Sequence, residues 1–310
     1  MSTSRTSRAR CLRIRALAKV NLSLRVLGIR PDGYHELRTT FQSLALHDTL
    51  TLTPARGVLS LTCDDSACPA DASNLVWVAA ERLWRADGRR GRPSGVAIAI
   101  AKRIPMQAGL GGGSSDAAAA LRALSLFWGV RTGSGALRAI AGQLGADVSF
   151  FLEGGTALGV ERGDVLYPLL DRPPASVVLV DSGFGVSTLD AYGWWDAANA
   201  AGARQRPSWP VSPESGERGN DLEAPVVAHH RAIGRIVKRL ASLGPQQAAM
   251  SGSGSVVFGL FSSESAAVEA AAALAAPGRV VTVTRTVSRR EYQRLSAPRE
   301  AAGSGTTICR

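Results

Sequence analysis

Residues 105–116 read Pro-Met-Gln-Ala-Gly-Leu-Gly-Gly-Gly-Ser-Ser-Asp, and an alanine-rich run follows without a break. Four glycines stand within five positions, at Gly109, Gly111, Gly112 and Gly113, so the backbone carries almost no side-chain bulk there. Such a backbone turns tightly and lets another molecule approach closely. Because the loop runs into the start of a helix, its unpaired N–H groups and the positive end of the helix dipole are suited to bind phosphate.

The flanks of the glycine loop favour this interpretation over a flexible surface linker, which is the alternative for any Gly/Ser-rich stretch. Residues 96–100 form an apolar, strand-like run before the loop, and residues 117–128 predict a helix that ends at Gly129. Two better-known phosphate motifs do not fit. A Walker loop needs a lysine after its second glycine, and the dinucleotide fingerprint needs a glycine where Ser114 stands.

The pattern Pro105-x-x-x-Gly-Leu-Gly-Gly-Gly-Ser-Ser resembles the phosphate loop of the galactokinase, homoserine kinase, mevalonate kinase and phosphomevalonate kinase (GHMP) superfamily. The triple glycine followed by Ser-Ser-Asp-Ala-Ala is most similar to the 4-diphosphocytidyl-2-C-methyl-D-erythritol kinases of the non-mevalonate isoprenoid pathway. The resemblance implies that ATP binds with Mg²⁺, and that Ser115 is a candidate ligand of the metal. The residues it implies for ATP are Pro105, Met106, Gln107, Ala108, Gly109, Leu110, Gly111, Gly112, Gly113, Ser114 and Ser115.

Length and composition limit the class of protein. The chain has 310 residues, of which 45% are hydrophobic, enough for one large domain or two ordinary ones. An apolar run of the roughly 18 residues that a membrane helix needs is not found, so no membrane partner is expected. The cysteines at 11, 63, 68 and 309 lack zinc-site spacing and are expected to be free thiols in the cytoplasm.

The net charge of +11 could suggest nucleic-acid binding, but its distribution argues against that partner. Five arginines lie within the first 15 residues, before any acidic residue, and residues 285–310 hold six arginines against two glutamates. Much of the excess charge is therefore terminal, and no basic helix interleaved with aromatic residues is found. A positive field would also help to gather anionic nucleotides.

The order of predicted elements favours an α+β fold, because strands and helices mix without regular βαβ alternation. Strands are predicted at residues 12–28, 37–44, 49–53, 58–62, 148–152, 156–160, 165–169, 176–180, 248–251, 256–261 and 280–287. Helices are predicted at residues 74–84, 117–128, 136–144, 188–198, 221–243 and 264–274. A loop is predicted at residues 201–219.

The pair of prolines at Pro173 and Pro174 is a candidate domain boundary. The resemblance implies an N-terminal half like domain 2 of ribosomal protein S5 and a ferredoxin-like C-terminal half. The expected division is a disordered basic tail at 1–10, an ATP-binding domain at 11–171, a second GHMP domain at 172–295 and a tail at 296–310.

Lys19 and Asn21 lie two residues apart in a run whose apolar and polar side chains alternate. The two side chains therefore share one face of the strand predicted at 12–28. Taken alone, the pattern favours a solvated polar face, because three arginines of the same run also stand at odd-numbered positions and so lie on the same face. The resemblance implies another role, since Ala-Lys-Val-Asn-Leu at 18–22 matches the opening motif of the erythritol kinases. There the lysine belongs to the active site and Asn21 would bind substrate.

Asp147 follows the helix predicted at residues 136–144, where an aspartate is usually a loop or cap residue. The resemblance instead implies that the Gly-Ala-Asp-Val motif supplies a base. Phosphoryl transfer needs in-line positioning, charge neutralisation and an acceptor for the hydroxyl proton. Asp147 would accept that proton, while the ammonium group of Lys19 would stabilise the developing charge.

The tetrapeptide Asp-Gly-Tyr34-His35 is either a hairpin turn with an incidental histidine or, as the resemblance implies, the part of the site that reaches cytosine. A phenol ring can stack on a base and an imidazole can bond its edge. The resemblance places a second aromatic against the base at Tyr192, with Phe184 as the alternative. The tandem Trp194-Trp195 nearby departs from the family pattern.

Two further motifs are family-like. Residues 250–255, Met-Ser-Gly-Ser-Gly-Ser, are either a plain β-turn or the third superfamily motif, which approaches the phosphate loop. Residues 220–223, Asn-Asp-Leu-Glu, are expected to be structural, with Asn220 or Asp221 capping a helix.

The resemblance implies a cytoplasmic, ATP-dependent kinase that phosphorylates the 2-hydroxyl of 4-diphosphocytidyl-2-C-methyl-D-erythritol. The partner expected is this small cytidine diphosphate, without nucleic acid or membrane, and the chain is expected to be a monomer or weak homodimer. One alternative is a sibling kinase of homoserine or mevalonate type. Another is a nucleotide-binding sensor that does not turn over.

Overall fold

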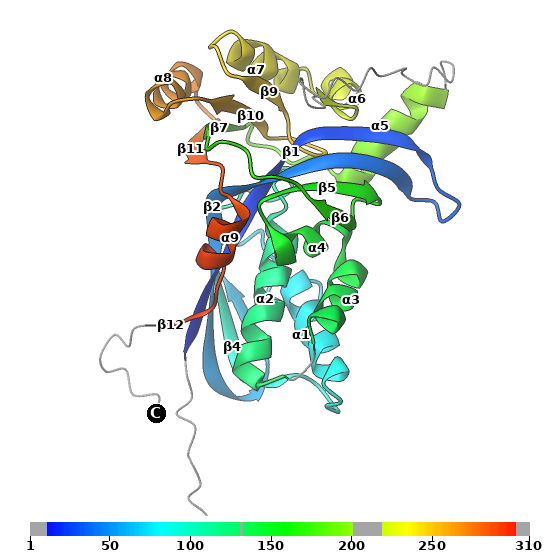
Figure 1. Cartoon of the computed structure of the whole chain (residues 1–310), viewed down its shortest axis with the longest axis vertical. Helices are drawn as coiled ribbons and strands as arrows, with labels where there is room; N and C mark the ends of the chain where they lie inside the picture. The colour runs from blue at the N-terminus through cyan, green and yellow to red at the C-terminus, as the bar shows by residue number, and fades with distance from the viewer. Residues whose placement is uncertain (1–10, 131–132, 201–218, 302–310) are drawn as a thin grey trace, which may run out of the picture.

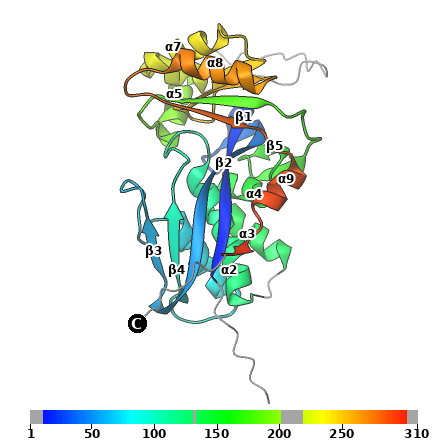
Figure 2. The same ribbon diagram turned by 90° about the vertical axis from the view of Figure 1, so that its left-hand side faces the viewer.

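The computed structural model describes residues 11–130, 133–200 and 219–301. Two sheets, each covered by helices on one face, form two units stacked along the long axis of the molecule (Figures 1 and 2). The basic tail expected at 1–10 lies outside the described residues, as do most of the loop expected at 201–219 and the last part of the tail expected at 296–310.

The first unit is built on an eight-stranded sheet. Its strands are β1 (Leu12–Ile29), β2 (His35–Val58), β3 (Ser60–Cys63), β4 (Ser94–Ala101), β5 (Thr156–Glu161), β6 (Val165–Pro168), β8 (Gly219–Asn220) and β12 (Arg299–Glu300). The main strand order is β12-β1-β2-β4-β3. In addition, β8 pairs with β1, β5 pairs with β2, and β6 pairs with β5. The helices of this unit are α1 (Leu75–Ala86), α2 (Gly112–Trp128), α3 (Ser134–Leu144), α4 (Ala146–Glu153) and α9 (Arg289–Leu295).

The second unit is a four-stranded antiparallel sheet with the order β11-β7-β10-β9. Its strands are β7 (Ser176–Asp181), β9 (Gln247–Met250), β10 (Val257–Phe261) and β11 (Val280–Arg285). Its helices are α5 (Thr188–Ala200), α6 (Glu223–His229), α7 (Arg231–Ala241) and α8 (Glu264–Leu274). Helices after β7 and between β10 and β11 make a β-α-β-β-α-β order, the ferredoxin-like arrangement. The prediction of an α+β fold is confirmed.

The two units are joined by a shared apolar layer. The long strands β1 and β2 pair with each other along most of their length. Ala18, Val20 and Leu22 of β1 pack in one buried cluster with Val177 of β7 and Phe258 of β10. Burial of this layer fixes the second sheet against the loop that precedes α2, because Ala108 and Leu110 belong to the same cluster.

Helix α2 brings the glycine loop close to the first sheet. Ala117, Ala118, Ala120 and Leu121 are buried at its N-terminal half. Small side chains let a helix approach its neighbours closely, and the interior packs without voids. Both ends of the helix are set by glycines in the left-handed region, Gly111 at its start and Gly129 at its end.

Two expectations about local structure are wrong, and one helix was not predicted. Residues 148–152 were expected as a strand because they are β-branched and aromatic, but they lie in α4, where Val148, Phe150 and Phe151 are buried. Tertiary packing decides the state of so short an apolar run. Residues 221–243 form two helices rather than one, and the break is at His230, whose φ of −125° and ψ of 73° are not helical. The helix α9 was not expected.

The chain crosses the expected boundary at 172 more than once. Tyr292 of α9 is buried in the core of the first unit, and β12, within the tail expected at 296–310, pairs with β1. β8 also pairs with β1. In the part of the chain that the structure describes, no helix has both the length and the apolar character to cross a bilayer.

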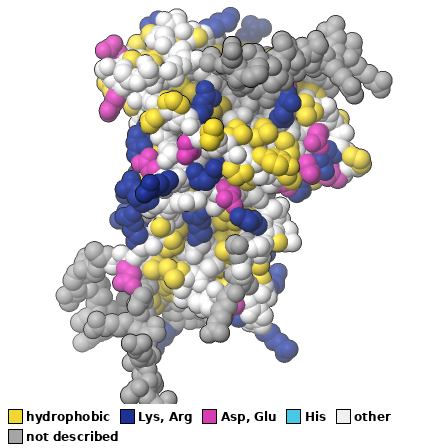
Figure 3. Space-filling model, viewed as in Figure 1, with side chains coloured by type: hydrophobic (Ala, Val, Ile, Leu, Met, Phe, Trp, Pro, Cys, Tyr) yellow, Lys and Arg dark blue, Asp and Glu magenta, His cyan; other side chains and the backbone are white. Residues whose placement is uncertain are grey.

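Lys and Arg side chains gather on one flank of the face shown in Figure 3, where Figure 1 places α9 and β11. Helix α9 carries Arg289, Arg290 and Arg294. Glu291 lies between them in the sequence, and its Oε1 is 2.7 Å from Nη2 of Arg285 at the end of β11. This basic surface does not line the cavity described below.

Candidate active site

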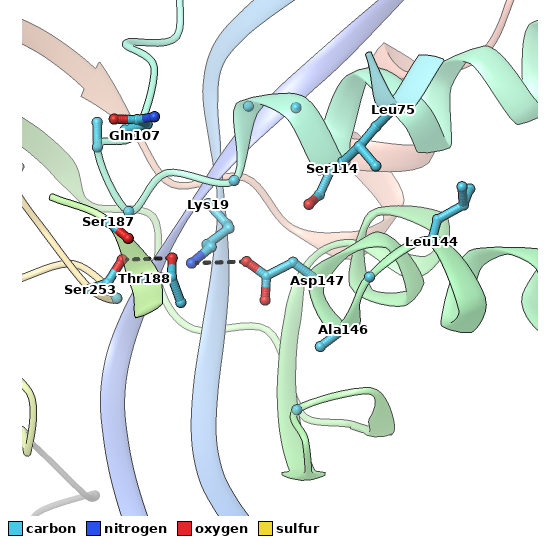
Figure 4. A pocket seen from close by; sticks show the side chains of 18 of the residues that line it. Lys19, Leu75, Gln107, Ser114, Leu144, Ala146, Asp147, Ser187, Thr188 and Ser253 are labelled. Carbon is cyan, nitrogen blue, oxygen red and sulfur yellow. Dashed lines mark hydrogen bonds and ion pairs between the residues drawn. The ribbon is translucent and has the colours of Figure 1, made fainter. Parts of the chain in front are cut away.

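A cavity of about 1120 Å³ lies where the two units meet. The first unit contributes β1, the glycine loop and the start of α4, and the second contributes the start of α5 and the turn after β9 (Figure 4). The cavity holds all but two of the residues predicted for the site. Those that line it are Lys19, Asn21, Tyr34, His35, Pro105, Met106, Gln107, Ala108, Gly109, Gly111, Gly112, Gly113, Ser114, Asp147 and Tyr192.

The glycine loop is held against the turn that follows β9. Gly109 has a φ of +75°, and a Cβ built there would lie 1.9 Å from the carbonyl oxygen of Ser251. The hydroxyl of Ser251 donates to the Gly109 carbonyl at 2.8 Å, and the N–H of Val256 donates to the Ala108 carbonyl at 3.3 Å. The third motif therefore contacts the phosphate loop, as the resemblance implied.

The loop ends where α2 begins, five residues earlier than expected from the alanine run. Gly111 is the N-cap residue of α2, with a φ of 72°, and makes no side-chain cap hydrogen bond. Gly112, Gly113 and Ser114, the first residues of the helix, line the cavity. The first N–H groups of a helix have no partners within it, so this end of α2 presents donors to an anion.

The side chains of Lys19 and Asp147 point toward each other in the cavity (Figure 4). The Lys19 Nζ lies 3.3 Å from Asp147 Oδ2, and the Lys19 side chain is 4% exposed while that of Asp147 is 33% exposed. Lys19 Nζ also donates to Asn21 Oδ1 at 2.6 Å. The solvated polar face that the alternation alone favoured is therefore wrong for these two residues.

An irregularity in β1 helps to explain this burial. The pairing of β1 with β2 shifts register between Leu17 and Lys19 and again between Asn21 and Ser23. Such bulges re-aim side chains. Asn21 is fixed in turn, because its Nδ2 donates to Thr39 Oγ1 at 2.7 Å. Asp147 lies in the first turn of α4, two residues after the N-cap residue Gly145.

The predicted base-binding residues also line the cavity, and two of them are in contact with each other. The rings of His35 and Tyr192 stack with centroids 4.5 Å apart, while Tyr34 is 58% exposed. Burial, and then the charge of Asp147, raise the pKa of the Tyr192 phenol, so it stays neutral. Phe184, the alternative to Tyr192, stacks on His230 and packs against the core of the second unit instead.

Ser115 is one of the two predicted residues outside the cavity lining, with Leu110. Its hydroxyl donates to the Leu17 carbonyl at 2.7 Å, and the residue is 1% exposed. Ser115 is therefore buried against β1, whereas the neighbouring Ser114 side chain faces the cavity (Figure 4). One residue along a helix turns the side chain by about 100°, which is why the glycine pattern alone does not distinguish the two serines.

Asn220 and Asp221 are structural, but neither caps a helix. The N-cap residue of α6 is Leu222. Asn220 Nδ2 donates to the carbonyl oxygens of Met250 and Gly252, at 3.0 and 2.7 Å. Asp221 Oδ1 lies 2.7 Å from Nη1 of Arg25 on β1. These contacts tie β1 to the turn that supports the phosphate loop.

Sequence reasoning missed several residues of the cavity wall. Thr188 at the start of α5 and Ser253 in the third motif contact each other, with their hydroxyl oxygens 3.2 Å apart. Asn74, which caps α1, lines the cavity at the far side of the glycine loop. An N-cap residue before an amphipathic helix is visible in the sequence, but its distance from the glycine loop is not.

A buried charge cluster lies beside the start of α2, and two of its members, Lys102 and Asp116, line the cavity. Lys102 Nζ lies 2.5 Å from Asp48 Oδ2 and 2.8 Å from Asp116 Oδ2. Asp48 also accepts from the backbone N–H groups of Arg103 and Ile104, whereas Asp116 Oδ1 is buried without a partner among the described residues. Burial raises the pKa of Asp116 to about 7, and the charge of Asp48 adds to this while Lys102 opposes it.

We expect Asp116→Asn to weaken the pH dependence of the free energy of unfolding between about pH 5 and pH 8. The pKa of Asp116 rises from 3.8 to about 7 on folding, so its contribution to stability is present below pH 4 and is lost as the pH rises toward 7. An amide does not ionise, and the variant should therefore lose less stability over this range. Urea unfolding at about pH 5 and pH 8 measures the difference.

The matched control is Glu269→Gln, which removes an exposed carboxylate of α8. It should leave the pH dependence of unfolding unchanged. Equal slopes for Asp116→Asn and the wild type would contradict a raised pKa at Asp116.

The chain resembles known proteins in sequence and in structure. A family model for the N-terminal domain of GHMP kinases matches residues 74–155, and one for the C-terminal domain matches residues 212–280. The 4-diphosphocytidyl-2-C-methyl-D-erythritol kinase of Pelotomaculum thermopropionicum is 41% identical over 89% of this chain and 98% of the relative. That of Solibacter usitatus is 42% identical over 95% of this chain and 93% of the relative.

Solved structures agree with the sequence matches. A crystal structure of 4-(cytidine 5'-diphospho)-2C-methyl-D-erythritol kinase superposes with a TM-score of 0.73 at 36% sequence identity. The match covers 88% of this chain and 98% of that one.

Proposed function

The chain belongs to the 4-diphosphocytidyl-2-C-methyl-D-erythritol kinases of the GHMP kinase family, and from this premise we propose the reaction that its cavity catalyses. It transfers the γ-phosphoryl group of ATP to the 2-hydroxyl of 4-diphosphocytidyl-2-C-methyl-D-erythritol, giving the 2-phosphate and ADP. The observation that carries the proposal is the pair Lys19 and Asp147, which shares one cavity with the glycine loop at the start of α2. The reaction belongs to isoprenoid precursor biosynthesis.

The N-terminal end of α2 binds the phosphates of ATP in this proposal. The backbone of residues 109–113 carries a single side chain, the buried Leu110, and bends through left-handed conformations at Gly109 and Gly111. Its N–H groups therefore reach phosphate oxygens that a bulkier loop would keep away. The contacts with Ser251 hold this backbone in place before the nucleotide arrives.

Asp147 and Lys19 act on the acceptor hydroxyl. The Asp147 carboxylate accepts the proton as the oxygen attacks phosphorus, and the Lys19 ammonium stabilises the charge that develops on the oxygen and on the transferring group. Lys19 is well placed for this because Asn21 holds its Nζ at 2.6 Å. The attacking oxygen, the phosphorus and the leaving oxygen must lie in line, and Lys19 lies beside the loop, since a Cβ built at Gly111 would be 3.2 Å from its Cε.

Mg²⁺ neutralises phosphate charge when it is bound with ATP. The described residues contain no cluster of three or more His, Cys, Asp or Glu that could hold a metal alone. This donor set suits an ion held largely by phosphate oxygens and water. The Ser114 hydroxyl, which faces the cavity, is the side chain we propose as its protein ligand (Figure 4).

Tyr34, His35 and Tyr192 bind the cytosine in this proposal. All three line the cavity, and together they offer aromatic faces and one imidazole edge. Stacking holds any base, while hydrogen bonds to its edge distinguish one base from another. A kinase for homoserine or mevalonate would have no base to bind here.

An ADP-release assay on three acceptors tests the proposed function. We expect turnover with 4-diphosphocytidyl-2-C-methyl-D-erythritol at least about 10²-fold above that with homoserine or mevalonate, because only the first acceptor has groups for the base-binding residues. Turnover with homoserine or mevalonate alone would overturn the cytosine assignment. Calorimetric ATP binding without ADP release on any acceptor would favour a nucleotide sensor.

A further inference from the structure

One face of α5 surrounds the imidazole of His35. Tyr192, Trp195 and Asp196 stand at positions i, i+3 and i+4 of this helix, so they share a face. Tyr192 stacks on the imidazole, and Trp195 meets it edge-on, with centroids 5.7 Å apart and planes at 89°. Asp196 Oδ1 lies 2.9 Å from His35 Nε2. The imidazole is thus in contact with Tyr192 through one ring face, with Trp195 edge-on and with Asp196 through one nitrogen.

The contact with Asp196 decides which nitrogen of His35 carries hydrogen. A carboxylate only accepts, so Nε2 donates to Asp196 and bears the hydrogen. In a neutral imidazole the other nitrogen, Nδ1, is then an acceptor. His35 lines the cavity beside Tyr34 and Tyr192, so this acceptor belongs to the wall that meets the base.

We propose that Asp196 is a positioning residue that holds His35 as the Nε2–H tautomer, so that Nδ1 accepts from the exocyclic amino group of cytosine. Uracil carries a carbonyl oxygen at the same position, and two acceptors facing each other repel. Asp196 therefore gives the site its preference for cytosine over uracil without touching the base. The identity of the base rests on the proposed function, whereas the tautomer rests on the contact between Asp196 and His35.

The tandem tryptophan explains how α5 stays in position. Trp194 lies outside the face that meets His35, and its ring stacks on His229 with centroids 4.1 Å apart and planes at 9°. The Trp194 ring also lies near the ring of His230, with centroids 5.5 Å apart. The two histidines end α6 and precede α7, so Trp194 fastens α5 to the junction between these two helices. A helix fixed before the substrate arrives loses less freedom on binding.

Variants of Asp196 and two nucleotides test the proposal. Binding of cytidine 5'-diphosphate and uridine 5'-diphosphate to the full chain is measured by calorimetry for the wild type, Asp196→Ala and Asp196→Asn. The control Asp190→Ala removes an exposed carboxylate of the same helix. The tautomer of His35 is read from its ¹⁵N chemical shifts in protein labelled at its 4 histidines, assigned with the variant His35→Gln.

We expect Asp196→Ala to weaken binding of the cytidine nucleotide by roughly tenfold and to leave the uridine nucleotide nearly unchanged. Asp196→Asn should recover most of the affinity, because its amide oxygen still accepts from Nε2. In turnover, KM for the cytidine substrate should rise with kcat within about twofold, since Asp196 lies away from the reacting atoms. Asp190→Ala should match the wild type.

An Nδ1–H tautomer in the wild type would overturn the proposal, as would unchanged or equally weakened binding of both nucleotides in Asp196→Ala. Absence of cytidine nucleotide binding to the wild type would overturn it as well. The proposed function fails on a different result, the lack of wild-type turnover with the cytidine substrate, so the two failures are distinguishable.

Discussion

Asp147→Asn is expected to lower kcat by about 10²-fold or more. The amide has nearly the shape of the carboxylate and still accepts from Lys19, whose Nζ lies 3.3 Å from Asp147 Oδ2 in the wild type. What the variant lacks is a group that takes the proton from the attacking hydroxyl. ATP affinity and KM for the acceptor should change little, because the loss is confined to the transition state.

Single-turnover ADP release measures this loss, with ATP binding followed separately by calorimetry. The matched control is Glu153→Gln at the other end of α4, where the carboxylate pairs with Arg138 on the surface at 2.8 Å. It should turn over like the wild type. Near-normal turnover of a folded Asp147→Asn would remove the general base from the mechanism and leave Asp147 as a partner of Lys19 only.

Local sequence was enough to predict the features that depend on backbone freedom and periodicity. The glycine loop, the strand β1 and the amphipathic helix α1 were predicted because their residues are close together in the chain. The end of α2 at Gly129 follows the same logic, since a cap needs only its own helix. The α+β fold follows from the order of these elements.

Tertiary contacts decided what the sequence left open. The apolar residues of α4 fit a strand or a helix, and only the core beside them selects the helix. Lys19 and Asn21 stand at odd-numbered positions, as exposed arginines of the same strand do. The alternation of apolar and polar residues does not reveal that the pairing of β1 with β2 is irregular. The contact between His35 and Asp196 joins residues 161 positions apart, and no pattern in either segment points to the other.

The third motif illustrates the same limit in the candidate site. A run of small residues at 250–255 predicts a turn, but a turn has no function until its neighbour is known. The structure places Gly109 against it so closely that Ser251 O would lie 1.9 Å from an added Cβ. The two small-residue segments are therefore one feature, because the backbone of Ser251 occupies the space that a side chain at Gly109 would need.

Gly109→Ala is expected to lower kcat/KM for ATP by about 10²-fold or more, because a displacement of about 1 Å at a reacting group has effects of this size. The added methyl group cannot occupy the position of the Ser251 carbonyl, and the φ of +75° is itself unfavourable for alanine. Either the loop or the turn must move. The N–H groups at the start of α2, which we propose bind phosphate, then lose their positions relative to Lys19 and Asp147.

The control Gly129→Ala separates backbone strain from the clash. Gly129, at the opposite end of α2, has a φ of +63° and open space where its Cβ would lie. It should lower the free energy of unfolding by roughly 1 kcal/mol and leave kcat/KM for ATP unchanged. Thermal unfolding and steady-state kinetics of both variants decide the matter. If Gly109→Ala loses stability but keeps wild-type kcat/KM for ATP, the loop supports the fold and does not hold the nucleotide.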